Sequence, residues 1–126
     1  MVEGSFDAEF ARAYQGGGSL DLRKIDSIST IFGDSIFLGI SQITEAWMIG
    51  TDADIWGDIP YSQADSFSTY KTPVLDPQQQ VYASVQALLS QGIANLATGA
   101  GVGPGGVDLV YGGKAAKWTA LAHTLK

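Results

Sequence analysis

The 126-residue sequence contains no cysteine, so it forms no disulfide and offers no thiolate for a metal site or for nucleophilic catalysis. Cations are also scarce, because seven Lys and Arg stand against thirteen Asp and Glu, for a net charge of −6 with the single histidine neutral. The basic residues are scattered along the chain, so we expect no nucleic-acid binding. No apolar run approaches the about 20 residues that a membrane-spanning helix needs.

The first residues, 1–4, contain neither a basic nor an apolar segment, and we expect no signal peptide in this chain. A hydrophobic share of 45% excludes a wholly disordered chain. The length is typical of one domain.

Glycine is abundant, with sixteen residues that gather at 16–18 and in the loop 98–107. Between these clusters, apolar residues at helical spacing predict a helix over 35–56, capped by Asp34 or Ser35. Small residues inside it, among them Gly39 and Gly50, indicate the close approach of a second helix. Gly57 is expected to end this helix in a left-handed conformation, and Pro60 prevents its continuation.

A second helix is predicted to follow Asp76 as N-cap, with Pro77 at its first position and Gln79 completing a capping box, and to end near Ala97. A third runs from Lys114 to the end of the chain. The segments 5–15 and 20–32 are weakly helical, and 107–111 is extended at most. The predicted class is all-α, with helices joined by long irregular connections.

Patterns that would carry chemistry are incomplete. Residues 101–106 match a dinucleotide-binding glycine motif, but a helix precedes them and an extended stretch follows, so we interpret them as a loop. Asp52 and Asp54 resemble the start of a calcium loop, yet its fifth position holds Trp56 and its twelfth holds Gln63.

Two further arrangements of acidic or basic residues are also incomplete as catalytic sites. Asp54 and Asp58 lie four residues apart, but Gly57 is expected to break the helix between them, and solvated or capping roles are favoured over glycoside hydrolysis. His123 lacks the other members of a serine-based triad. We therefore predict no catalytic residues, no metal site, no cofactor and no enzyme activity.

Aromatic residues give the remaining candidates for recognition. Trp47, Tyr82 and Trp118 lie at helical spacing and are assigned to the core. Tyr61 and Tyr70 lie in a predicted loop, where binding residues concentrate, and both could stack on sugar rings. They are the predicted ligand-binding residues.

An ordered series of motifs carries a family resemblance: 56–64 (WGDIPYSQA), 72–73 (TP), 76–82 (DPQQQVY), 108–113 (DLVYGG), 117–118 (KW) and 120–126 (ALAHTLK). This series resembles the SusD/RagB-like nutrient-binding proteins of the outer membrane. The likeness runs from about residue 34 to the end of the chain. Its structural motif residues here are Trp56, Gly57, Asp58, Pro60, Tyr61, Asp76, Pro77, Tyr111, Gly112, Gly113 and Trp118.

The resemblance implies tetratricopeptide-like helix pairs that form a scaffold beside a more irregular ligand-binding region. It also implies a lipoprotein on the outer surface of the outer membrane. Such a protein captures glycans, peptides or other nutrients and passes them to a partner TonB-dependent (SusC-like) transporter. Members of this family bind nutrients and are not enzymes.

Family members are much longer than this chain and begin with a lipid-anchored cysteine. We therefore expect residues 1–126 to be a single partial domain, a fragment of the helical scaffold whose membrane anchor lies elsewhere. Its one-sided helices then leave an exposed apolar patch, or self-associate to cover it. The alternative function is a helical protein-interaction module without carbohydrate binding, which uses its grooves for a partner helix or peptide.

Overall fold

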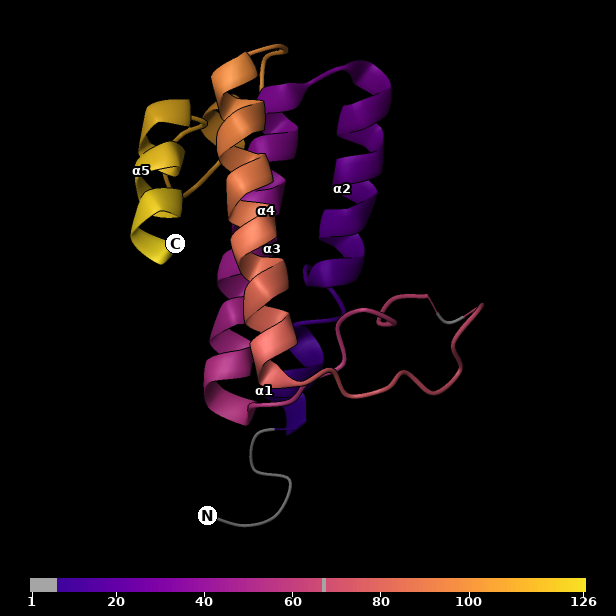
Figure 1. Ribbon diagram of the computed structural model, residues 1–126. Helices are drawn as coiled ribbons and strands as arrows, with labels where there is room; N and C mark the ends of the chain where they lie inside the picture. The colour runs from indigo at the N-terminus through magenta and orange to yellow at the C-terminus, as the bar shows by residue number, and fades with distance from the viewer. Residues whose placement is uncertain (1–6, 67) are drawn as a thin grey trace.

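A computed structural model describes residues 7–66 and 68–126. Its helices are α1 (Asp7–Arg12), α2 (Ser19–Phe32), α3 (Ser35–Trp56), α4 (Gln78–Thr98), the 3-10 turn η1 (Gly105–Val107) and α5 (Ala115–Leu125). In Figure 1 the long helices α2, α3 and α4 run side by side, and α5 lies beside α3 and α4 on the side away from α2. The predicted all-α class is confirmed. None of the described helices has the length and apolarity to cross a membrane.

The core lies chiefly in the seam between α3 and α4. Ile43, Ile49 and Leu89 are fully buried there, and Val81 is almost so. Gly39 and Gly92 let the two helix backbones meet, because a Cβ added at Gly39 would lie 2.8 Å from the Gly92 carbonyl oxygen. The close approach predicted from Gly39 is therefore confirmed.

The ends of α3 follow the local signals in the sequence. The Asp34 carboxylate accepts a hydrogen bond of 2.9 Å from the Phe37 backbone nitrogen, which makes Asp34 the N-cap. At the other end, Gly57 adopts a φ of 77°, a conformation that favours glycine. α5 begins after Lys114, as predicted.

The predicted start of α4 is wrong in its capping residue. Pro77 occupies the N-cap position, and the Asp76 side chain makes no bond to the helix. Instead, the backbone nitrogen of Gln78 donates to Asp58 Oδ1 at 2.9 Å, so the capping carboxylate comes from twenty residues earlier in the chain. No Gln79 capping box forms, because the Asp76 carboxylate is committed to another segment.

Three further predictions are corrected. Trp118 is buried at 2% exposure as expected, but Trp47 is 44% exposed and Tyr82 is 36% exposed. The segment 107–111 is not extended, since it contains the end of η1 and a series of turns. The helix expected over 5–15 is short and ends at Arg12, and its first two residues lie outside the described residues.

Candidate functional site

The connection between α3 and α4, residues 57–77, contains most of the motif residues singled out in the sequence. Asp76 organises it, because its carboxylate accepts hydrogen bonds from the backbone nitrogens of Tyr61 (2.8 Å) and Ser62 (2.6 Å) and from Ser62 Oγ (2.7 Å). The backbones of Ile59 and Asp76 also pair in an antiparallel bridge. Burial raises the pKa of Asp76, but these hydrogen bonds outweigh it and hold the pKa below its usual range.

Tyr61 is anchored at the start of this connection. Its hydroxyl donates to Glu45 Oε1 on α3 at 3.1 Å, and the Arg23 guanidinium of α2 lies 5.5 Å from the centre of its ring. Burial, followed by the negative charge of Glu45, raises the pKa of Tyr61, so the hydroxyl stays protonated and donates. Tyr61 therefore joins α2, α3 and the connection.

A polar hub joins these segments and consists of Ser19, Arg23, Glu45, Tyr61 and Asp65. Arg23 lies at its centre. Its Nε lies 3.6 Å from Glu45 and 3.7 Å from Asp65, and its Nη1 donates to the Ala64 carbonyl oxygen at 2.8 Å. Burial raises the pKa of Glu45, and Arg23 opposes the shift. Ser19, at the start of α2, donates to Asp65. Ser19 and Arg23 thus fasten α2 to the connection, and Arg23 also joins α2 to Glu45 of α3.

Tyr70 lies further along the same connection and is 41% exposed. Within residues 7–66 and 68–126, no hydrogen bond or ring contact joins it to Tyr61. The two predicted ligand-binding residues therefore differ: Tyr61 is held inside the polar hub, whereas the Tyr70 ring is accessible.

A second clamp surrounds Asp108, before α5. Its carboxylate accepts hydrogen bonds from Trp118 Nε1 (2.7 Å), Gly113 nitrogen (2.8 Å) and Val110 nitrogen (2.9 Å). The Tyr111 ring packs edge-on against Trp118 with centres 5.4 Å apart. Burial raises the pKa of Asp108, but the donated hydrogen bonds lower it below its usual range. The motif 111–113 and Trp118 therefore form a closed turn.

The glycine motif at 101–106 is indeed a loop. The backbone nitrogens of Val102 and Gly103 donate to the Asp34 carboxylate at 3.2 and 3.0 Å, and a Cβ at Gly101 would collide with that side chain. Because a carboxylate of the chain itself occupies these amides, they do not form a phosphate cradle.

The three aspartates near the end of α3 have separate surroundings. Asp54 accepts from the Tyr82 hydroxyl, and Asp58 caps α4. Asp52 is 7% exposed, and its Oδ2 has no hydrogen-bond partner among the described residues. Burial raises the pKa of Asp52 to about 6. Within the described part of the chain, no three His, Asp or Glu residues gather as metal ligands would.

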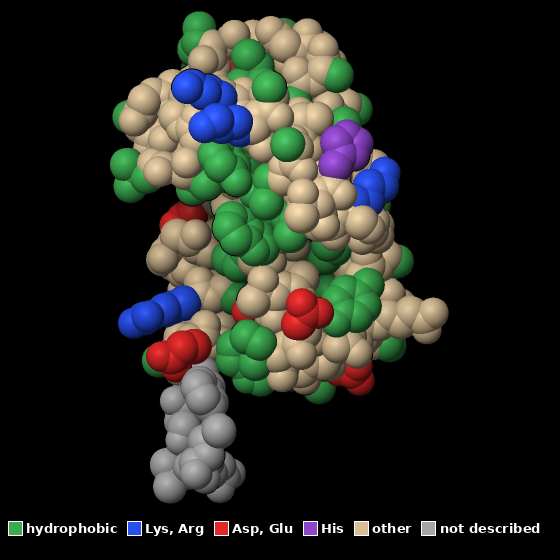
Figure 2. Space-filling model, turned by 90° about the vertical axis from the view of Figure 1, so that its left-hand side faces the viewer, with side chains coloured by type: hydrophobic (Ala, Val, Ile, Leu, Met, Phe, Trp, Pro, Cys, Tyr) green, Lys and Arg blue, Asp and Glu red, His purple; other side chains and the backbone are tan. Residues whose placement is uncertain are grey.

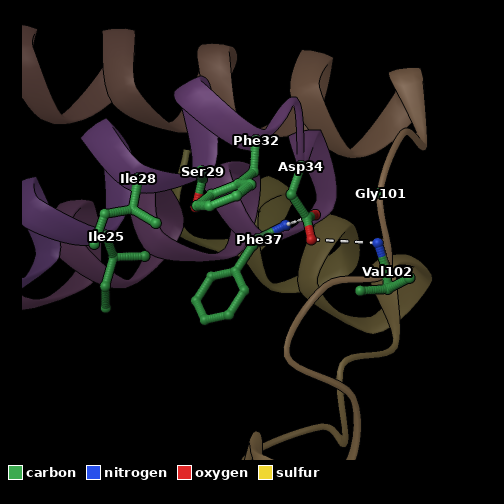
Figure 3. Close-up of a pocket in the computed structure, with 8 residues that line it drawn as sticks. All are labelled: Ile25, Ile28, Ser29, Phe32, Asp34, Phe37, Gly101 and Val102. Carbon is green, nitrogen blue, oxygen red and sulfur yellow. Dashed lines mark hydrogen bonds between the residues drawn. The ribbon is translucent and has the colours of Figure 1, made fainter.

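An apolar groove of about 530 Å³ lies between the end of α2, the start of α3 and the glycine-rich loop. Its walls include Ile28, Phe32, Phe37 and Val102, and Figure 3 shows the Asp34 hydrogen bonds that close one end. Phe32 is 81% exposed and Val102 is 89% exposed. Exposed apolar surface of the kind expected from the sequence is therefore present on this side of the molecule.

The polar hub is the feature that the sequence did not indicate. Arg23, Glu45 and Asp65 come from three separate segments, and only their contact in the folded chain relates them. Arg23 is one of only seven basic residues and lies in a helix with apolar positions, which is the one available signal.

These features define an all-α scaffold in which aspartates clamp the connections between helices. A family model described as "Starch-binding associating with outer membrane" (SusD-like) matches residues 6–126, and the chain belongs to this SusD-like family. The predicted family is thereby confirmed.

A solved structure supports the same assignment. The chain is similar to a SusD/RagB family protein from Bacteroides thetaiotaomicron, with 27% sequence identity and a TM-score of 0.81. The match covers 98% of this chain and 26% of that protein, so this chain spans about a quarter of its relative's length. No curated protein matches the chain significantly.

Proposed function

We propose that this chain is part of a surface protein that binds glycans or other nutrients at the outer membrane. The protein delivers them to a partner TonB-dependent transporter and is held at the membrane by a lipid anchor. Residues 1–126 form a single partial domain that carries part of the helical scaffold. The family match over residues 6–126 is the observation that carries this proposal.

The geometry supports a division of roles within the α3–α4 connection. Asp76 and the polar hub fix the first half of the connection, and the exposed Tyr70 ring follows it. In this proposal Tyr70 contacts the nutrient, and Tyr61 positions the connection through its bonds to Glu45 and Arg23. The chain acts by binding and catalyses no reaction.

A glycan array tests the binding step. The purified protein is expected to retain neutral glycans, and Tyr70→Ala is expected to weaken their retention with an unchanged thermal transition. Tyr61→Phe removes only the hydroxyl bond to Glu45 and serves as the matched variant of the anchored tyrosine. Failure of the protein to bind any glycan or peptide nutrient would contradict the proposal.

The delivery step is tested separately. Tagged protein isolated from outer membranes of the native host is expected to carry a TonB-dependent transporter with it. Recovery of the protein from the membrane without any transporter would contradict this part of the proposal, whatever the glycan array shows.

The apolar groove favours a second candidate function, a helical protein-interaction module without carbohydrate binding. Its lining by Ile28, Phe32 and Phe37 suits the apolar face of a partner helix or peptide. A partner helix whose binding is lost in Phe32→Gln, together with an absence of glycan binding, would favour this function over nutrient capture.

A further inference from the structure

Trp47 and Tyr82 line a cleft between α3 and α4, on the surface of the seam that α2 does not cover. The cleft has a volume of about 290 Å³, and Leu125 of α5 closes one side of it. Figure 2 looks onto the side of the molecule on which α5 lies, and it shows hydrophobic side chains along the middle of that face with acidic side chains below them. The volume lies just below the range of about 300–1,000 Å³ that is usual for sites of drug-sized molecules, so the cleft has room for a single ring.

The aromatic rings are exposed and one of them is held in place. Trp47 is 44% exposed and Tyr82 is 36% exposed, although their helical spacing predicted burial. The Tyr82 hydroxyl donates to Asp54 and accepts from Gln78 Nε2 at 3.1 Å. Binding therefore does not have to order the Tyr82 side chain, which lowers its entropic cost.

Small or buried residues line the bottom of the cleft. They are Ala46, Gly50 and Val85, and a Cβ built at Gly50 would lie at an ordinary 3.6 Å from Val85. Because position 50 carries no side chain, a ring can lie along the helix surface beside the Trp47 indole.

Polar groups that are available to a ligand lie around these rings. Within residues 7–66 and 68–126, no hydrogen bond reaches Asp54 Oδ2, the Gln86 side-chain amide or Trp47 Nε1. The Asp54 carboxylate and the Gln86 amide oxygen are acceptors, and the Gln86 amide nitrogen and the Trp47 indole nitrogen are donors. They lie around a partly apolar cleft. A pyranose ring has the complementary surface, with an apolar C–H face and a rim of hydroxyl groups.

The negative charge of the cleft and of the whole chain affects which ligands the cleft can bind. Asp54 is the only charged side chain in the lining of this cleft, and the whole chain carries a net charge of −6. Both disfavour an anionic ligand such as an acidic oligosaccharide.

We propose that the cleft lined by Trp47, Tyr82 and Asp54 is a binding site for a neutral sugar ring of an oligosaccharide. The ring stacks on Trp47, its hydroxyls donate to Asp54 Oδ2, and the Gln86 amide bonds a further hydroxyl. This inference rests on the proposed nutrient-binding function and adds a site to it that is separate from Tyr70.

Titration with maltohexaose, a neutral starch oligosaccharide, tests the site in the intact protein. Acrylamide quenching of tryptophan fluorescence reports on Trp47, because Trp118 is only 2% exposed and Trp56 is partly buried. We expect maltohexaose to protect one accessible indole from quenching. Isothermal titration calorimetry then gives the affinity of each variant, and circular dichroism confirms that each variant is folded.

Trp47→Ala is expected to abolish binding at this cleft, and Gln86→Ala to weaken binding there about fivefold, the effect of losing one hydrogen bond of about 1 kcal/mol. Ile55→Ala is the control, because Ile55 lies on the same helix, is 63% exposed and does not line the cleft. An oligogalacturonate of similar length is expected to bind far more weakly than maltohexaose.

The outcomes separate this inference from the function on which it rests. If Tyr70→Ala abolishes maltohexaose binding while Trp47→Ala and Gln86→Ala leave it unchanged, the cleft is not the site and nutrient binding stands. Equal affinity for oligogalacturonate would also overturn the neutral-sugar assignment. If the protein binds no glycan at all, both the inference and the proposed glycan binding are wrong.

Discussion

The α3–α4 seam and the exposed side of α2 contain the same kinds of apolar residue, but these residues are buried in the seam and exposed on α2. Ile43 and Ile49 of α3 are fully buried against α4, whereas Ile31 and Phe32 of α2 are 79% and 81% exposed. A side chain's apolar character thus does not decide its burial. The difference arises from the neighbour, because α4 covers one face of α3 and none of the described residues covers this side of α2.

The two interfaces also differ in chemistry. The seam is apolar and tight enough to require glycine at position 39, whereas α2 is joined to its neighbours by hydrogen bonds and ion pairs of Arg23, Ser19 and Ser41 in addition to the buried Leu22. Apolar packing is sensitive to volume, and hydrogen bonds are sensitive to the loss of a partner. The following predictions test this difference.

The largest effect is expected from Gly39→Ala. A Cβ at this position would lie 2.8 Å from the Gly92 carbonyl oxygen and 2.8 Å from Leu96 Cγ, so the helices must separate. We expect the free energy of unfolding to fall by about 2–3 kcal/mol, the upper part of the range of about 1–3 kcal/mol found for overpacked cores, as measured by urea denaturation.

Gly50→Ala is the matched control in the same helix. Its Cβ would make only ordinary contact with Val85, at 3.6 Å, so the gain in helix propensity should leave stability unchanged or raise it by up to about 1 kcal/mol. Equal destabilisation by the two substitutions would show that the backbones of α3 and α4 do not approach most closely at Gly39.

Asp76→Ala should have the next largest effect. It leaves the backbone nitrogens of Tyr61 and Ser62 without their acceptor, and we expect a loss of about 2 kcal/mol in the free energy of unfolding. Asp58→Ala, which removes the carboxylate that caps α4, should cost about 1 kcal/mol. The reverse order would show that the Asp58 cap contributes more to stability than the hydrogen bonds of Asp76 within the connection.

Signals that act within a few residues were predictable from the sequence. The bounds of α3, its Asp34 cap and its end at Gly57 all depend on neighbours along the chain. The α4 cap was not predictable, because Asp58 and Gln78 meet only when the connection folds back. The spacing of Asp76 before Pro77 was a valid local signal that a tertiary contact overrode.

The candidate sites also depend on contacts between segments that are far apart in the sequence. Tyr61 and Tyr70 were correctly placed in a connection, but the sequence could not show that Arg23 and Glu45 hold Tyr61 and leave Tyr70 exposed. Helical spacing predicted that Trp47 is buried. Spacing identifies residues that share a helix face, but it does not show where the covering helix ends.

Asp52→Asn should change how stability depends on pH. Burial raises the pKa of Asp52 from 3.8 to about 6, so the folded protein binds this proton more tightly than the unfolded chain. This group therefore makes stability fall as the pH rises from about 4 to 6. We expect the asparagine variant to be more stable than the original protein by about 1 kcal/mol at pH 7, with little difference near pH 4.

The pKa values of Asp76 and Asp108 are shifted in the direction opposite to that of Asp52. Their hydrogen bonds lower both pKa values, so their contribution to stability is present at neutral pH and is lost as the pH falls through the lowered values. These groups are present in both proteins, so the difference between the two stability–pH curves isolates Asp52. A constant difference across pH 4–7 would refute the assigned shift.

The smallest effect on stability is expected from Phe32→Gln on the exposed side of α2. Because the ring is 81% exposed, the free energy of unfolding should change by less than about 0.5 kcal/mol. Self-association should fall, because the substitution removes the largest exposed side chain of the apolar groove. Sedimentation velocity at increasing protein concentrations measures the self-association.

Leu109→Gln is the matched control, since Leu109 is 96% exposed and lies outside the groove. An equal fall in both variants would mean that association depends on general surface hydrophobicity, and that the groove on α2 is not the specific counterpart of the closed α3–α4 seam.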